Sequence, residues 1–109
     1  MTIVNHECYV SLEVANLLIK AGFDWRDYFV AHSIDEHFHW EIPLHIAQRW
    51  LREVKNISVD VLHQHNGWVF GITDLSNDSS LTVKLITSST YEEALEAGIK
   101  KTLELILKK

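Results

Sequence analysis

The sequence contains one cysteine, Cys8, among its 109 residues. A single thiol forms no disulfide within the chain and no cysteine-based zinc cluster. The N-terminus, MTIVNHECYV, lacks a basic segment followed by a long apolar run, so we predict no signal peptide. No apolar stretch approaches the roughly 20 residues needed to cross a bilayer. These absences predict a soluble, cytoplasmic protein with no membrane partner.

The sequence also lacks the short motifs that carry common catalytic chemistries. It has no glycine-rich phosphate loop, no Gly-x-Ser-x-Gly elbow, no Walker motif and no His-Glu-x-x-His pair. Cys8 has His6 two residues away, which is too little for a thiol nucleophile. We therefore expect no enzymatic activity and no cofactor.

Positive charge is scarce as well, because 10 Lys and Arg stand against 15 Asp and Glu, for a net charge of −5. An acidic balance opposes the counterion release that dominates nucleic-acid affinity, so nucleic acid is not the expected partner. Between residues 23 and 42 the acids outnumber a single base, Arg26. These acids are Asp24, Asp27, Asp35, Glu36 and Glu41.

Helical periodicity is present near the N-terminus. The stretch SLEVANLLIKAGF predicts a first helix with Ser11 as its N-cap. Gly22 is the expected left-handed residue after this helix. Phe23 would then pack against Leu18 in a Schellman motif, so both ends of the helix are marked in the sequence.

Two further helices are predicted. Pro43 is the expected first residue of PLHIAQRWLREVK. The last helix, TYEEALEAGIKKTLELI, opens with a capping box formed by Thr90 and Glu93. Helical spacing predicts buried stripes of Ala47, Trp50, Leu51 and Val54 in the former, and of Tyr91, Leu95, Ile99 and Leu103 in the latter.

Strand signals fall in three places. YFVAH and HFHWEI, residues 28–32 and 37–42, predict a first hairpin around Ser33–Glu36. In ISVDVLHQHNGWVFGITDL, Asn66 and Gly67 predict a type I′ turn, in which both positions need a positive φ. That turn would pair His65 with Trp68, His63 with Phe70, Val61 with Ile72 and Val59 with Asp74. LTVKLI, residues 81–86, predicts a further strand.

The predicted order of elements is α-β-β-α-β-β-β-α over a single domain, residues 1–109. Antiparallel strands with helices between them indicate an α+β fold in which helices pack on one face of the sheet. A domain of this length buries roughly two-thirds of its unfolded surface, which suffices for a core without disulfides. Unpaired strand edges leave both a monomer and a homodimer open.

From Pro43 onward, the predicted order α-β-β-β-α resembles the double-stranded-RNA-binding fold. That resemblance implies RNA binding as an alternative function, through the polar side of the second helix with His45, Arg49 and Arg52. Domains of that fold bring the basic N-terminus of their last helix to the phosphates. Here Glu92 and Glu93 occupy those positions and would repel phosphate.

The seven histidines raise the question of a metal site. The pairs His37/His39 and His63/His65 each place two imidazoles on one face of a predicted strand. Both pairs together, or His32, His37, His39 and Glu41, could complete a tetrahedral zinc site. The alternative interpretation is that polar hairpin ends tolerate histidine and that charged clusters form exposed faces. We predict no metal ligands, and the second alternative function is a histidine-based, metal-dependent protein.

Three stretches carry a resemblance to known sequences: YVSLEVANLLIKAGFD, PLHIAQRWLREVKNISVDV and TYEEALEAGIKKTLELI. Together they resemble small uncharacterised proteins of Bacteroidetes phages and mobile elements. The resemblance implies a phage or mobile-element origin and transfers no functional residues. The Thr-x-Glu-Glu-Ala-Leu run is also similar to the helix of HicB-type antitoxins, although GITDLSNDS stands where that family has Pro-Asp-Leu-Pro-Gly.

We expect a non-enzymatic protein-interaction module from a phage or mobile element that binds a host protein with a basic surface. A sharper form of this hypothesis is a counter-defence inhibitor, similar in action to an anti-CRISPR protein, because charge complementarity steers association. The predicted partner-binding residues are Asp24, Asp27, Asp35, Glu36, Glu41, His37 and His39.

Overall fold

The computed structural model describes residues 9–24, 42–64, 66–83 and 88–108. Its strands form a three-stranded antiparallel sheet in the order β1-β2-β3, which confirms the predicted α+β class. The elements are α1 (Leu12–Lys20), α2 (Leu44–Val54), β1 (Ile57–Gln64), β2 (Gly67–Asp74), β3 (Ser79–Val83) and α3 (Tyr91–Leu107).

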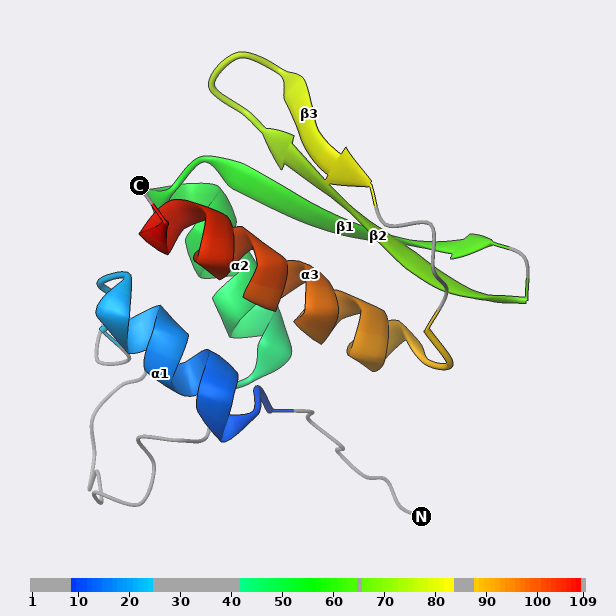
Figure 1. Cartoon of the computed structure of the whole chain (residues 1–109), viewed down its shortest axis with the longest axis horizontal. Helices are drawn as coiled ribbons and strands as arrows, with labels where there is room; N and C mark the ends of the chain where they lie inside the picture. Colours follow the sequence, from blue (N-terminus) through cyan, green and yellow to red (C-terminus); the bar gives the residue numbers. More distant parts are fainter. Residues whose placement is uncertain (1–8, 25–41, 65, 84–87, 109) are drawn as a thin grey trace.

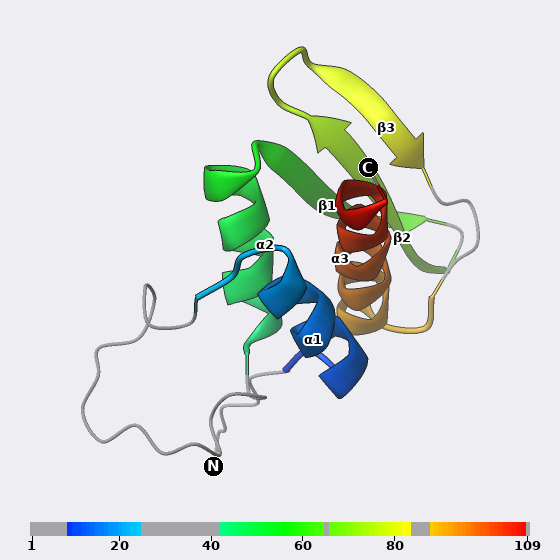
Figure 2. The ribbon, with the colours of Figure 1, turned by 60° about the vertical axis from the view of Figure 1, so that its left-hand side comes forward.

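The three helices lie on one side of the sheet (Figure 1). Helix α3 packs across β1 and β2, α2 packs against β1 and α3, and α1 packs against α3. The helices run in the same general direction, so their C-terminal ends gather at one side of the molecule (Figures 1 and 2). The end of the β1–β2 hairpin and the start of α3 lie at the opposite side.

The first predicted hairpin, residues 28–42, lies outside the described residues apart from Ile42. The carbonyl of Ile42 accepts a hydrogen bond from the backbone N–H of Val10 at 2.9 Å, and Tyr9 forms a bridge with Pro43. This short pairing places the segment before α1 beside the segment before α2.

Helix α1 begins and ends as predicted. The Ser11 hydroxyl accepts a hydrogen bond from the Val14 N–H at 3.3 Å. Gly22 follows the helix with φ +106°, and its N–H donates to the Ile19 carbonyl. The Phe23 N–H donates to the Leu18 carbonyl at 2.9 Å, which completes the predicted Schellman motif.

Helix α2 differs from the prediction in two respects. Pro43 is its N-cap, so the helix begins one residue later than expected. Leu44 belongs to the buried stripe, whereas Val54 is 54 % exposed and the prediction for that residue is wrong. Helical spacing predicts on which side of the helix Val54 lies. It does not predict whether another part of the protein packs against that side in the last turn.

The predicted register of the second hairpin is wrong by two residues. Val59 pairs with Ile72, Val61 with Phe70 and His63 with Trp68. Gln64 pairs with Gly67, so Gly67 lies in β2 and Asn66 holds the positive φ of 62° at the turn. Among the described glycines, Gly22 is the one with a positive φ. A shift of two leaves every side chain on its predicted face, since strand side chains alternate with a period of two.

Strand β3 begins two residues earlier than predicted, at Ser79, and residues 84–86 of the predicted strand lie outside the described residues. A positive φ of 56° at Asp78 reverses the chain before it. After residue 87, Ser88 pairs with Trp68 through two backbone hydrogen bonds of 2.7 and 3.0 Å. The segment that leads to α3 is thereby held beside β2.

Helix α3 begins at the predicted N-cap, Thr90, but the reciprocal bond of Glu93 goes to the residue before the cap and not to Thr90 as in a capping box. The Thr90 hydroxyl accepts from the Glu93 N–H at 3.1 Å, and the Glu93 carboxylate accepts from the Ser89 N–H. Leu95, Ile99 and Leu103 are buried as expected. Tyr91 is 39 % exposed instead, because it stands at the end of the helix.

Gly98 marks the closest approach of α3 to the sheet. A Cβ atom at this position would lie 2.6 Å from Cγ1 of Val59 and 3.1 Å from ring atoms of Phe70. The core extends from this contact through α2 to α1. Its fully or nearly buried residues include Val14, Leu18, Phe23, Ile42, Trp50, Leu51, Val59, Ile99 and Leu103.

Candidate interaction surface

Most of the predicted partner-binding residues lie outside the described residues. They are Asp27, Asp35, Glu36, Glu41, His37 and His39. Asp24 is described and is partly buried just after α1. The acidic segment therefore stays a prediction from sequence.

The residues of the alternative RNA surface are all described. His45, Arg49 and Arg52 are exposed on α2, on the side away from the core. Arg49 Nε lies 2.9 Å from the Glu53 carboxylate, and about half of each side chain is exposed. This ion pair offsets one of the two permanent positive charges of the helix face, which leaves little charge for phosphate.

Of the residues in the predicted alternative metal site, the structure describes His63 alone. His65 lies outside the described residues, and so does the His37/His39 pair. Among the residues that are described, no group of three His, Cys, Asp or Glu side chains could hold a metal ion. The His63 ring instead packs against the Trp68 ring, with centroids 4.8 Å apart.

Charge is segregated along the described chain. The described residues between Asn56 and Ile99 contain no Lys or Arg. Their acids are Asp60, Asp74, Asp78, Glu92, Glu93 and Glu96. The described bases lie elsewhere, in the three helices and just after two of them: Lys20, Arg49, Arg52, Lys55, Lys100, Lys101 and Lys108. The sheet and the first half of α3 therefore carry charge of one sign.

Three aromatic side chains meet within this acidic half. Trp68 of β2 contacts His63 of β1 on one side and Tyr91 of α3 on the other, both in edge-to-face geometry. The Trp68 and Tyr91 ring centroids are 5.5 Å apart. The pairing of Trp68 with Ser88 brings the start of α3 to this point, because only two residues separate Ser88 from Tyr91.

The aromatic cluster is accessible to a partner. His63 is exposed, Tyr91 is 39 % exposed and Trp68 is partly buried between them. Glu92, next in sequence to Tyr91, is exposed and makes no hydrogen bond or ion pair with any described residue. We call the ring cluster of His63, Trp68 and Tyr91, together with Glu92 in the first turn of α3, the aromatic–acidic surface.

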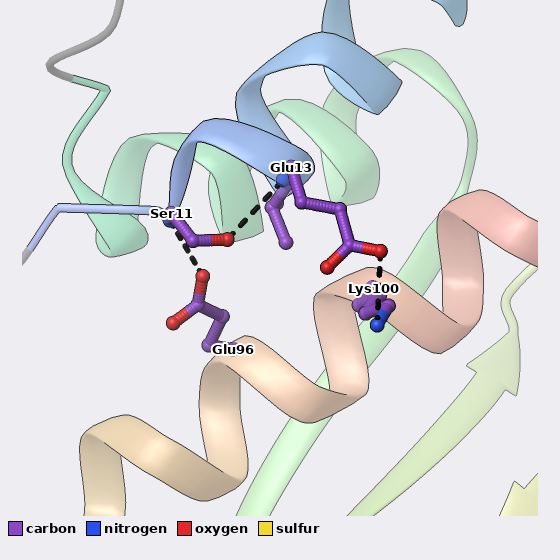
Figure 3. A network of polar contacts seen from close by, with 5 residues as sticks. Ser11, Glu13, Glu96 and Lys100 are labelled. Carbon is purple, nitrogen blue, oxygen red and sulfur yellow. Dashed lines mark hydrogen bonds and ion pairs between the residues drawn. The ribbon is translucent and has the colours of Figure 1, made fainter.

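Other acids of α1 and α3 have partners within the protein (Figure 3). Glu96 accepts a hydrogen bond from the Ser11 N–H at 2.6 Å. Glu13 of α1 lies 3.2 Å from the Lys100 ammonium. Together with the Glu93 contact to Ser89, these interactions leave Glu92 as the acid of the first turn that is available to another molecule.

The sequence prediction missed Trp68, Tyr91 and Glu92 as surface residues. Helical spacing predicts Tyr91 in the buried stripe of α3, and the predicted register pairs Trp68 with His65, whereas Trp68 pairs with His63. One signal was readable in advance, namely the absence of Lys and Arg between Lys55 and Lys84. The contact between β2 and α3 was not, because it depends on tertiary structure.

Within the described residues, no helix is both long and apolar enough to cross a membrane. No family model, no curated protein and no solved structure matches this chain.

Proposed function

We propose that this protein is a non-enzymatic interaction module that binds a partner protein through a basic surface of that partner. The observation that carries the proposal is charge segregation: the described sheet and the first half of α3 hold acids and no Lys or Arg. A surface of one sign steers a complementary partner and repels partners of like charge.

The exposed aromatic side chains support the same proposal. Trp, Tyr and Arg dominate the binding energy of protein interfaces, whereas Glu and Asp at the rim affect mainly the rate of association. Trp68 and Tyr91 are partly accessible within the acidic half. Side chains that can contribute binding energy therefore lie in the same half as the acids that attract a basic partner. The acidic segment at residues 24–41 adds further negative charge to the chain.

In its most specific form, the proposal is that the protein originates from a phage or mobile element and acts in the cytoplasm on a host protein. A counter-defence inhibitor that occupies the basic nucleic-acid channel of a host effector fits both its charge and its size. Such channels are lined with Lys and Arg, which the acidic half would pair with in place of phosphate.

The experiment is affinity capture from a lysate of the host bacterium, with and without nuclease treatment. The captured material is analysed for protein, for RNA and for metal. We expect protein that is retained after nuclease treatment and released by salt, because exposed charges are screened at high ionic strength.

Two variants separate the alternatives. Charge reversal by Asp60→Lys with Glu92→Lys should release the captured protein, whereas Arg49→Ala with Arg52→Ala should retain it. Captured RNA that is lost from the α2 variant would instead establish the RNA-binding alternative. About one metal ion per untagged chain would establish the metal-dependent alternative.

A further inference from the structure

Exposed aromatic rings receive two common classes of charged or charge-bearing ligand: nucleotides, whose bases stack on them, and cations, which are attracted to the ring face. The charge around the aromatic–acidic surface discriminates between these classes. A nucleobase brings a phosphate with it, and the acids of the sheet and α3 repel phosphate. A cation is attracted both by the rings and by the acids.

The dipole of α3 does not reverse this preference. The positive end of a helix dipole is equivalent to about half an elementary charge. The first turn of α3 holds two carboxylates, Glu92 and Glu93, so its net charge is negative. A cation at the start of this helix therefore meets an attractive field.

The shape of the ligand follows from the combination of rings and a carboxylate. A guanidinium group is planar, is weakly hydrated, stacks on aromatic rings and pairs with a carboxylate through two parallel hydrogen bonds. An ammonium group is a strongly hydrated point charge and gains less from a ring. Glu92 is exposed and makes no hydrogen bond or ion pair with any described residue, so its oxygens can accept both bonds.

We propose that the aromatic–acidic surface receives an arginine side chain of the basic partner, which contacts the ring cluster around Trp68 and pairs with Glu92. This inference rests on the proposed function and names the chemical group that the partner presents. It distinguishes a defined binding position from a diffuse attraction between opposite charges.

The test uses three short peptides of equal length, rich in arginine, lysine or glutamate, added to the ¹⁵N-labelled full-length protein at low salt. The indole N–H resonance of Trp68 is assigned with the Trp68→Phe variant. We expect the arginine peptide to shift this resonance and to bind about two- to five-fold more tightly than the lysine peptide, which corresponds to the usual strength of an exposed cation–π contact.

Matched variants separate local pairing from net charge. Glu92→Gln and Glu104→Gln each remove one negative charge from an exposed position of α3. Glu92→Gln should weaken arginine-peptide binding several-fold, and Glu104→Gln should leave it nearly unchanged. Tyr91→Ala should also weaken binding, and the thermal unfolding of each variant shows whether the protein is still folded.

Three results with the peptides would overturn the inference: no binding of the arginine peptide at low salt, equal effects of the two glutamine variants, or a Trp68 resonance that the bound peptide leaves unshifted. In the last two cases a salt-sensitive basic partner captured from lysate would still stand, so the proposed function and this inference can fail separately. A single-stranded RNA that shifts the Trp68 resonance more strongly than the arginine peptide would also overturn it.

Discussion

Glu96 of α3 accepts a hydrogen bond from the backbone N–H of Ser11, with 2.6 Å between the nitrogen and Oε2. Ser11 is the N-cap of α1, and its hydroxyl accepts from the Val14 N–H of the same helix. Two backbone N–H groups at the start of α1 thus have acceptors. One acceptor is the helix's own cap, and the other is a residue 85 positions away in the sequence. Ser11 therefore takes part both in the local cap of its own helix and in a tertiary contact with α3.

Replacement of Glu96 should test this contact. Glu96→Ala leaves the Ser11 N–H without its carboxylate acceptor, so we expect the free energy of unfolding to fall by about 1 kcal/mol, as for loss of a helix cap. Glu96→Gln keeps an acceptor oxygen and should cost less. Glu104→Ala on the same helix should change stability by no more than about 0.5 kcal/mol. Equal losses in the two alanine variants, measured by urea denaturation, would contradict the contact.

Gly98→Ala should destabilise the protein although alanine is the better helix former. The helix-propensity gain is about 1 kcal/mol, whereas forcing a methyl group into a packed core costs about 1–3 kcal/mol. The second variant, Gly98→Ala with Val59→Ala, removes the Cγ1 atom that lies 2.6 Å from the new methyl group. We expect the double variant to lose less stability than the sum of the single losses, and strict additivity would argue against the clash.

Trp50→Ala should cost about 3–5 kcal/mol, because a large buried side chain leaves a cavity. Trp50 is 2 % exposed and contacts the Phe23 ring edge to face, with centroids 5.5 Å apart. His45→Ala on the exposed side of the same helix provides the control and should be nearly neutral. A Trp50→Ala protein of wild-type melting temperature that had lost only partner binding would reverse this assignment.

Asn66, rather than Gly67, should respond to a β-branched substitution at the turn. Its φ of 62° is tolerated by Asn and Gly, whereas valine in this conformation is strained by about 1–2 kcal/mol. Asn66→Gly should therefore keep the melting temperature and Asn66→Val should lower it. Identical thermal unfolding of the two variants would show that the turn has another conformation.

The acidic segment predicted from sequence can be compared with the aromatic–acidic surface by charge reversal. Asp35→Lys with Glu36→Lys should slow association with a basic partner and change stability by no more than about 0.5 kcal/mol. The rate of association is measured at two salt concentrations beside the Glu92→Lys variant. Wild-type association of the Asp35 and Glu36 variant at both concentrations would remove that segment from the interface.

Local features of the fold could be predicted because their causes lie within a few residues. The Ser11 cap, the Schellman motif at Gly22 and Phe23, and the Thr90 cap depend on side chains and backbone groups three to five positions apart. The faces of the β1–β2 hairpin were also predicted, since alternation along a strand needs no partner. The charge asymmetry of the chain was visible in its composition.

Tertiary structure alone decided the register of that hairpin and the position of the aromatic–acidic surface. Helix α3 packs across both strands, and Gly98 lies against Val59 and Phe70 together, so the register must suit a helix more than 25 residues away in sequence. The turn follows that register and places the positive φ at Asn66. Trp68 and Tyr91 meet for the same reason, because contacts between distant segments depend on how whole elements pack, and no short stretch of sequence carries that information.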